Sequence, residues 1–386
     1  MIEGAHLIME IGDITLDLAP QGVVESLVEL QVNESSGTQR SGFQFKLKYE
    51  AESEIGRELI PTGFFDAPKR VKFTLLMQGN KHTLIDGVIT RQDITQSSSP
   101  GQSALTITGM DLTQVMDQID LTGVPMPAMP TFVQVGVVLA PYMAYGIVPT
   151  VIPTVQLANF NPAKSVPARQ GTDYAHVTRL ASEAGYVFYI YHDDNLGANV
   201  AYWGPEVQLG ELQKPLSINM DADSNIDAIS FGYDGISKPL YVLMHKDDDI
   251  TGMTIPIPFP GTNPLSPPLG PDLIAPRKFV QINHKENKTE DNDAMAKASL
   301  PEVLLRGLGK AAQAANVVNA SGTLDVLRYG GLLRARHLVS VRGAGDRYSG
   351  YYYVQKTTTT IKPGSIQQSF ALKRNAHGIF PGSVAA

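Results

Sequence analysis

One stretch of this chain occurs twice, once near each end. Residues 71–109 read VKFTLLMQGNKHTLIDGVITRQDITQSSSPGQSALTITG, and residues 335–374 read ARHLVSVRGAGDRYSGYYYVQKTTTTIKPGSIQQSFALKR. In both copies a glycine precedes the glycine of a Pro-Gly pair by fourteen residues. Each copy predicts a strand, a turn, a long strand, a Pro-Gly turn and a further strand. The copies lie about 263 residues apart, too far for a solenoid of short repeats, so one β-rich module is used twice.

The paired glycines of VRGAGDRYSG (341–350) also fit the beginning of a dinucleotide-binding loop. That motif needs a third glycine where Tyr348 stands and a helix after it, whereas YYYVQKTTTTI is typical of a strand. The glycines are therefore interpreted as turn residues, which adopt positive φ at low cost. The structural turn glycines predicted in the two copies are Gly79, Gly87, Gly101, Gly343, Gly350 and Gly364.

Further strands and helices are predicted between the copies. Residues 41–50 (SGFQFKLKYE) alternate apolar and polar side chains, the pattern of a half-buried strand. The segment 131–146 predicts a helix with Thr131 as N-cap and a kink or early end at Pro141. A second helix begins after the N-cap Thr172 and ends at Gly185, and the strand YVFYIY follows. Residues 253–276 contain eight prolines and predict an extended loop.

The composition excludes several classes of function. The chain has no cysteine, which excludes thiolate metal sites and thiol nucleophiles. The apolar stretch 132–153 is interrupted by prolines and predicts a buried helix and a short strand rather than a membrane span. The net charge is −7, yet residues 328–374 contain nine Lys or Arg and one acid. A basic segment indicates either nucleic acid binding or a sheet surface that faces protein partners, and the second interpretation is favoured.

Motifs that carry chemistry are not found in the sequence. There is no H-E-x-x-H and no G-x-S-x-G, and GLGK (307–310) lacks the other residues of a Walker A loop. The acidic clusters 192–194 and 245–249 are interpreted as solvated turns, and His176 as a capping or surface residue. No catalytic, cofactor-binding or metal-binding residue is predicted, and no cofactor is expected.

Two segments resemble the tail hub family, which comprises phage late control protein D, the central baseplate hub, and the N-terminal part of VgrG-type spikes. The first is GTDYAHVTRLASEAGYVFYI, a helix followed by a strand. The second is LLRARHLVSVRGAGDRYSGYYYVQKTTTTIKPGSIQQSFALKRNA, with its glycine hairpin and closing basic strand. The resemblance is closest over residues 172–190 and 330–376.

The resemblance implies a mainly β, α+β fold with two tube-like antiparallel β-barrels and a smaller α/β middle domain. The expected boundaries are 1–128 for the first barrel, 129–215 for the middle domain, 216–378 for the second barrel and 379–386 for a tail. The second barrel would include the Pro-rich loop 253–276 and a helix within 290–318. Three chains would then present six barrels, so a homotrimer would adapt a hexameric tube to a trimeric spike.

The function that the resemblance implies is a non-enzymatic structural hub in the baseplate of a contractile phage tail or phage-like injection particle. Its expected partners are the inner tube protein, a separate spike protein and other baseplate proteins, without nucleic acid or stable membrane insertion. Assembly in the bacterial cytoplasm is expected. Arg334, Arg336 and Arg347 are expected to face neighbouring proteins. A tail-associated cell-wall hydrolase and a nucleic-acid-binding β-barrel protein are the alternatives.

Overall fold

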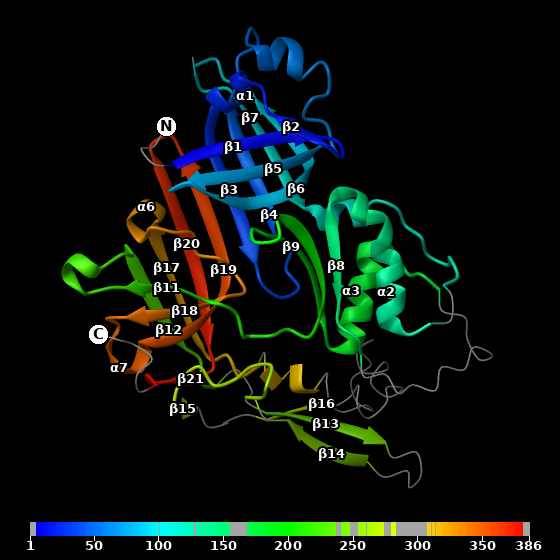
Figure 1. Ribbon diagram of the computed structural model, residues 1–386, viewed down its shortest axis with the longest axis vertical. Helices are drawn as coiled ribbons and strands as arrows, with labels where there is room; N and C mark the ends of the chain where they lie inside the picture. Colours follow the sequence, from blue (N-terminus) through cyan, green and yellow to red (C-terminus); the bar gives the residue numbers. More distant parts are fainter. Residues whose placement is uncertain are drawn as a thin grey trace.

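The computed structural model describes residues 5–99, 101–126, 129–154, 168–236, 241–247, 254–259, 261–273, 279–282, 307–309, 311–312 and 314–380 (Figure 1). Its main feature is a thirteen-stranded sheet to which both ends of the chain contribute. The predicted mainly β, α+β fold class is therefore confirmed. Two three-stranded sheets and one two-stranded sheet complete the described strands.

The N-terminal part of the large sheet contains seven strands. They are β1 (Ala5–Gly12), β2 (Leu16–Leu18), β3 (Leu27–Ser35), β4 (Gly42–Lys48), β5 (Arg70–Met77), β6 (Asn80–Thr95) and β7 (Ala104–Asp111). The alternation predicted over 41–50 is confirmed in β4, where Phe43, Phe45 and Leu47 are buried. Three short helices lie along this part, α1 (Gln21–Glu25), η1 (Ile55–Leu59) and η2 (Leu112–Asp117).

The C-terminal part contributes six strands to the same sheet. They are β11 (Leu212–Ser217), β12 (Ala228–Tyr233), β17 (Val318–Asp325), β18 (Leu338–Arg342), β19 (Gly350–Lys362) and β20 (Ser365–Arg374). The short helices η4 (Asp221–Asp223), α6 (Val326–Tyr329) and α7 (Gly345–Tyr348) lie between these strands. Helix α7 occupies the connection between β18 and β19, which pair as an antiparallel hairpin as predicted.

The two parts repeat the same order of strand pairing. The order is β5–β6–β7–β4–β3 in the first part and β18–β19–β20–β17–β12 in the second, antiparallel throughout. The long strand of each part contains a bulge opposite its third strand, at Thr90 in β6 and at Gln355 in β19. The sequence repeat is therefore a repeat of the fold. The copies differ at one edge, because β1 is antiparallel to β5 whereas β11 is parallel to β18.

The two copies are joined within one sheet. The first part of β19 pairs with β18, and its residues 356–361 pair with residues 30–35 of β3. Among the described strands neither copy closes on itself, so the two expected barrels are open modules joined edge to edge. The length of β19 causes the junction, because the strand continues past the end of β18 and its free backbone groups bond to the other copy.

The middle of the chain forms a small α/β unit beside the large sheet (Figure 1). It contains the helices α2 (Thr131–Leu139) and α3 (Asp173–Ala184), the 3₁₀ helix η3 (Ala140–Tyr145), and the strands β8 (Ile147–Val151), β9 (Val187–Asp193) and β10 (Ala198–Gly204). Strand β10 lies between β8 and β9, parallel to the first and antiparallel to the second. Trp203, fully buried, donates its indole N–H to the Val177 carbonyl of α3 at 3.3 Å. This bond attaches the helix to the sheet.

The predictions for the two middle helices have different outcomes. Thr172 caps α3 by accepting from the Ala175 N–H at 3.2 Å, and Gly185 ends the helix in the left-handed conformation, as predicted. Thr131 is not the N-cap of α2. It is the first residue of the helix, and Pro130 occupies the N-cap position. As predicted at Pro141, the α-helix gives way there to the 3₁₀ helix η3. No helix in the described ranges is long and apolar enough to cross a bilayer.

The Pro-rich segment is not wholly a loop, and this corrects the prediction. Residues Thr254–Phe259 form β14, which pairs with β13 (Tyr241–Asp247), and β13 also pairs with β16 (Phe279–Ile282). Strand β14 lies at the edge of this sheet, where proline is tolerated because a missing N–H on the outer side breaks no ladder bond. Farther on, β15 (Asp272–Leu273) pairs with β21 (Ala376–His377). Of the helix predicted within 290–318, residues 307–309, 311–312 and 314 are helical, and 290–306 lie outside the described residues.

Candidate functional site at the junction of the repeats

An ion pair and its accompanying hydrogen bonds connect the two copies and the middle unit. The Arg334 guanidinium, just before β18, donates to the Asp194 carboxylate at 2.9 Å and to the Thr83 carbonyl at 2.8 Å. The same carboxylate accepts the Thr83 N–H at 3.0 Å. Thr83 belongs to β6 of the first copy, and Asp194 directly follows β9 of the middle unit. The charge at Arg334 therefore fixes the positions of three parts of the chain relative to one another.

A second arginine of the same segment is bound in a comparable way. The Arg336 side chain, 10% exposed, pairs with Glu34 at 3.3 Å and donates to the Ser35 carbonyl. Its guanidinium lies 4.3 Å from the centre of the Tyr189 ring in β9, a cation–π contact. Glu34 also accepts the Ala335 N–H at 3.2 Å. Burial, a carboxylate and an aromatic ring together make this a rigid contact between the second copy and β3.

These contacts correct the expectation that Arg334 and Arg336 face neighbouring proteins. Both side chains point into the junction, because their carboxylate partners lie elsewhere in the same chain. Asp194, the acid of the 192–194 cluster that pairs here, lies in a turn and is exposed, as predicted, and its carboxylate also binds Arg334 and Thr83. Some of the basic residues of the C-terminal segment therefore form ion pairs with acidic residues from other parts of the same chain.

A third pair attaches the middle unit to the first copy. Arg70 of β5 donates to both carboxylate oxygens of Asp86 in β6, at 2.8 and 2.6 Å. Asp86 also accepts from the Asn199 amide of β10 at 2.8 Å, and Arg70 donates to the Tyr145 carbonyl at 2.9 Å. Both charged side chains are almost fully buried. A buried bidentate pair with its remaining donors and acceptors satisfied favours one relative arrangement of the two units.

A groove of about 890 Å³ runs along the junction and contains three histidines, His82, His192 and His337. His82 Nδ1 lies 3.6 Å and His192 Nε2 3.9 Å from the Asp194 carboxylate. Burial lowers the pKa of His192 and of His337. Asp194 is committed to Arg334 and Thr83, so it does not offer a free base to these rings. Within the described residues no three metal-ligating side chains lie close enough to hold an ion.

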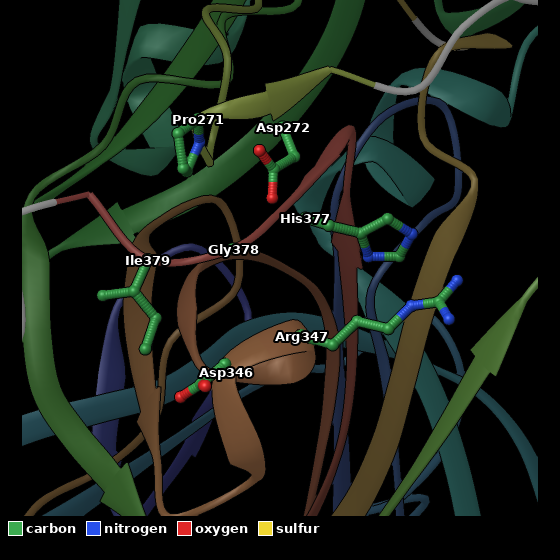
Figure 2. Close-up of a pocket in the computed structure, with 7 residues that line it drawn as sticks. All are labelled: Pro271, Asp272, Asp346, Arg347, His377, Gly378 and Ile379. Atoms are coloured by element: carbon green, nitrogen blue, oxygen red, sulfur yellow. The ribbon is translucent and has the colours of Figure 1, made fainter.

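A second hollow, of about 580 Å³, lies near the C-terminal end of the described chain (Figure 2). Figure 2 shows Arg347 and His377 directed to one side of it, with Asp346 and Ile379 on the other. The buried Arg374 supports its wall by donating to the carbonyls of Ser349 and Leu269, at 2.9 and 3.1 Å. Arg347, the third arginine expected to face a partner, therefore lines a surface hollow.

The six glycines predicted in turns do not all lie in turns. Gly79, Gly101, Gly343, Gly350 and Gly364 have positive φ at or between strand ends. Gly87 lies within β6, which corrects the prediction. A side chain there would meet the Met110 carbonyl at 2.2 Å and the Phe43 ring at 3.0 Å, so the position needs glycine for close packing rather than for a turn.

His176 is also placed differently from its prediction as a capping or surface residue. It lies on α3 with only 1% of its surface exposed, among buried residues of the middle unit. Burial, with Arg179 nearby, lowers the pKa of its imidazole to about 4. Its Nδ1 accepts the Gln170 N–H at 3.4 Å. The apolar neighbours Val177 and Leu180 on the same helix are buried too, so the ring belongs to the core.

Comparison with known proteins gives matches in structure only. No family model matches the sequence, and no curated protein matches it. The fold is similar to the tail protein from Neisseria meningitidis MC58, at 14% identity over 96% of this chain and 97% of that one, with a TM-score of 0.52. It is similar to the 43 kDa tail protein of prophage MuSo2 from Shewanella oneidensis, at 12% identity over 96% and 98%, with a TM-score of 0.57. A chain of the half-lidded Francisella PdpA–VgrG complex matches at 10% identity over 100% and 61%, with a TM-score of 0.53.

These likenesses define a class of fold. The chain has the fold of phage tail proteins across nearly its whole length. More particularly, it shares that fold with a chain of a PdpA–VgrG complex, so the mainly β, α+β fold implied by its resemblance to the tail hub family is confirmed. The matched prophage and Neisseria chains are tail proteins, and the third is part of a PdpA–VgrG complex.

Proposed function

We propose that this chain is a structural, non-enzymatic hub of the baseplate in a contractile phage tail or phage-like injection particle. Three copies form a ring that adapts the hexameric inner tube to a trimeric spike, itself a separate polypeptide. The chain is assembled in the bacterial cytoplasm and becomes part of the particle. Its division into a module at 1–128, a middle domain at 129–215 and a second module at 216–378 is part of the same proposal.

The observation that carries the proposal is the repeated strand order within one continuous sheet. One chain presents two similar β-modules side by side, so three chains present six. Such a ring has near-sixfold symmetry on the side of the modules and exact threefold symmetry overall. A threefold object with six similar modules fits both a hexameric tube and a trimeric spike, which a chain with one module does not.

The buried ion pairs of the junction support a mechanical role. Arg334, Arg336 and Arg70 each connect two or more parts of the chain; the ion pairs of Arg336 and Arg70 are largely buried, and that of Arg334 is partly exposed. The buried pairs are strongly destabilising to break, because an uncompensated buried charge remains. A chain whose modules are fixed in this way transmits force without changing their relative positions, as contraction of a sheath requires.

The test is the mass of the particle that the chain forms. A homotrimer of 41.7 kDa chains has a mass of about 125 kDa, which light scattering after size exclusion measures directly. The measurement is made on the chain alone and with the tube and spike proteins of the same particle. Retention as single chains in the presence of both partners contradicts the proposal. Release of peptidoglycan fragments by the purified chain contradicts the non-enzymatic assignment.

A further inference from the structure

Two strand edges of the large sheet are left without a described partner. Strand β6 continues past β5, whose pairing ends at Val88, so residues 91–95 of β6 pair with β7 on one side only. Strand β12 pairs with β17 on one side, and no strand in the described ranges pairs with its other side. Unpaired edges without protection are templates for pairing with another chain. The sequence of β12, AISFGY, contains neither the charge nor the proline that commonly protects an edge.

The repeat identifies what these two edges correspond to. The two copies can be aligned by starting at the residue after each bulge and crossing the sheet through directly paired residues. In the first copy this row of paired residues is Arg91, Thr108, Gln44 and Gln31. In the second copy it is Lys356, Ala371, Ser321 and Ser230. The free part of β6 is thus equivalent to residues 356–361 of β19, and β12 is equivalent to β3. In the chain, these equivalents pair with each other and join the two copies.

We infer that residues 91–95 of β6 pair antiparallel with β12 of a neighbouring chain of the same protein. Within the chain Thr360 pairs with Gln31. Thr95 is the equivalent of Thr360 and Ser230 is the equivalent of Gln31, so the same register sets Thr95 opposite Ser230 of the neighbour. The inference rests on the proposed function and names the contact between the chains of the ring. The contact joins two different surfaces of the chain, so it is a head-to-tail contact. Such contacts form a closed ring when each chain is rotated relative to the last, and a ring of three chains contains three of them.

The side chains at the two edges match in this register. Ile94 is 43% exposed, whereas its equivalent Thr359 is 4% exposed because β3 of the adjoining copy covers it. The register sets Ile94 opposite Phe231 of the neighbour, an apolar pair on the core face of the sheet. It also sets Arg91, which pairs with Asp93 of its own strand at 2.7 Å, opposite Asp234 of the neighbour, a pair of opposite charge. Both pairings follow from the repeat alone, without adjustment of the strands.

Disulfide trapping tests the register directly, because the chain has no cysteine of its own. Residues directly opposite each other in antiparallel strands lie within disulfide reach. The double variant I94C/F231C is expected to form covalent dimers and trimers that run as single chains after reduction. Within one chain the two positions lie at opposite ends of a run of eight strands, so a bond inside a monomer is out of reach. The matched control is I94C/L209C, since Leu209 is also exposed but lies outside β12.

The charge pair gives a second measurement. R91E and D234R are each expected to weaken the association of chains about two- to fivefold, the range for an exposed ion pair. The double variant R91E/D234R is expected to regain the original affinity, which a general loss of folding does not produce. Association is measured by light scattering over a series of protein concentrations, with the tube and spike proteins present.

The outcomes separate this inference from the proposed function. Covalent trimers from I94C/F231C, absent in the control, support the edge pairing. A preparation that is trimeric by mass but gives no covalent species overturns the edge pairing and leaves the trimeric hub in place. A preparation that stays as single chains with tube and spike proteins present overturns both.

Discussion

The ring of Phe43 in β4 lies against the backbone of Gly109 in β7. The two residues are direct partners in the sheet, and a methyl group added to Gly109 would lie 2.2 Å from the Phe43 Cζ atom. Phe43 also packs edge to face against Phe73, with 5.5 Å between ring centres. A glycine has no side chain, so the aromatic ring of its partner can pack directly against the backbone of the sheet. This contact fixes the packing of the first module.

The variant Gly109→Ala is expected to lower the free energy of unfolding by about 2–3 kcal/mol, because the added methyl group overpacks a closed site. Gly136→Ala is the matched control. Gly136 lies in α2 with no atom within 4 Å of the added group, so helix propensity dominates there. The control is expected to gain about 0.5–1 kcal/mol. Chemical denaturation followed by circular dichroism measures both, and equal effects of the two variants speak against the packing argument.

The first turn glycine of each repeat, Gly79 in one and Gly343 in the other, has different surroundings. Gly343 has a φ of 75°, and a side chain there would lie 1.7 Å from the Ile218 carbonyl oxygen. Gly79 has a φ of 81° with open space around it. Gly79→Ala is therefore expected to cost about 1–2 kcal/mol from backbone strain alone, and Gly343→Ala clearly more. Thermal unfolding of the two variants ranks them, and a larger loss at Gly79 contradicts the expectation.

The ion pair between Arg334 and Asp194 is expected to stabilise the chain through its position between three parts. Arg334→Met removes the donor to Asp194 and Thr83, at a cost of about 1–3 kcal/mol for the groups left unpaired. A double-mutant cycle with Asp194→Asn is expected to give a coupling of about 1–2 kcal/mol. The control is the exposed pair Lys48–Glu50, where the same cycle is expected to show little coupling. Equal coupling in both pairs removes the argument for a special junction.

Local patterns in the sequence correctly predict strand β4 and helix α3. The alternation in β4 and the cap Thr172 of α3 depend on side chains within a few residues, so they can be recognised without the fold. The repeat predicts more, because it implies an equivalent strand order in two distant places. Thr131 fails as a cap because Pro130, already at a fixed φ, takes the preceding position.

The contacts of the junction have no local signal in the sequence. Arg334 pairs with a residue 140 positions away, and Arg336 with one 302 positions away. The uneven distribution of charge indicates only that some basic residues have acidic partners. The role of Gly87 is predicted wrongly for a related reason, since the Met110 carbonyl and the Phe43 ring that require glycine there come from other strands. The fold brings these residues together, so they become visible only when it is known.

The buried His176 predicts how stability depends on pH. Burial, with Arg179 nearby, lowers the pKa of His176 from its ordinary value of 6.5 to about 4. Between these two values the unfolded chain binds a proton at this site and the folded chain does not, so the free energy of unfolding falls as the pH falls from 6.5 towards 4.

His176→Gln is expected to make that fall shallower, because the amide accepts the Gln170 N–H but takes up no proton. The slope is reduced rather than lost, since burial lowers the pKa of His192 and His337 as well. The exposed His6, changed to Gln, serves as the control for a histidine outside the core. Urea unfolding at a series of pH values from 4 to 7 measures the slope, and an unchanged slope in His176→Gln contradicts the assignment of this histidine to the core.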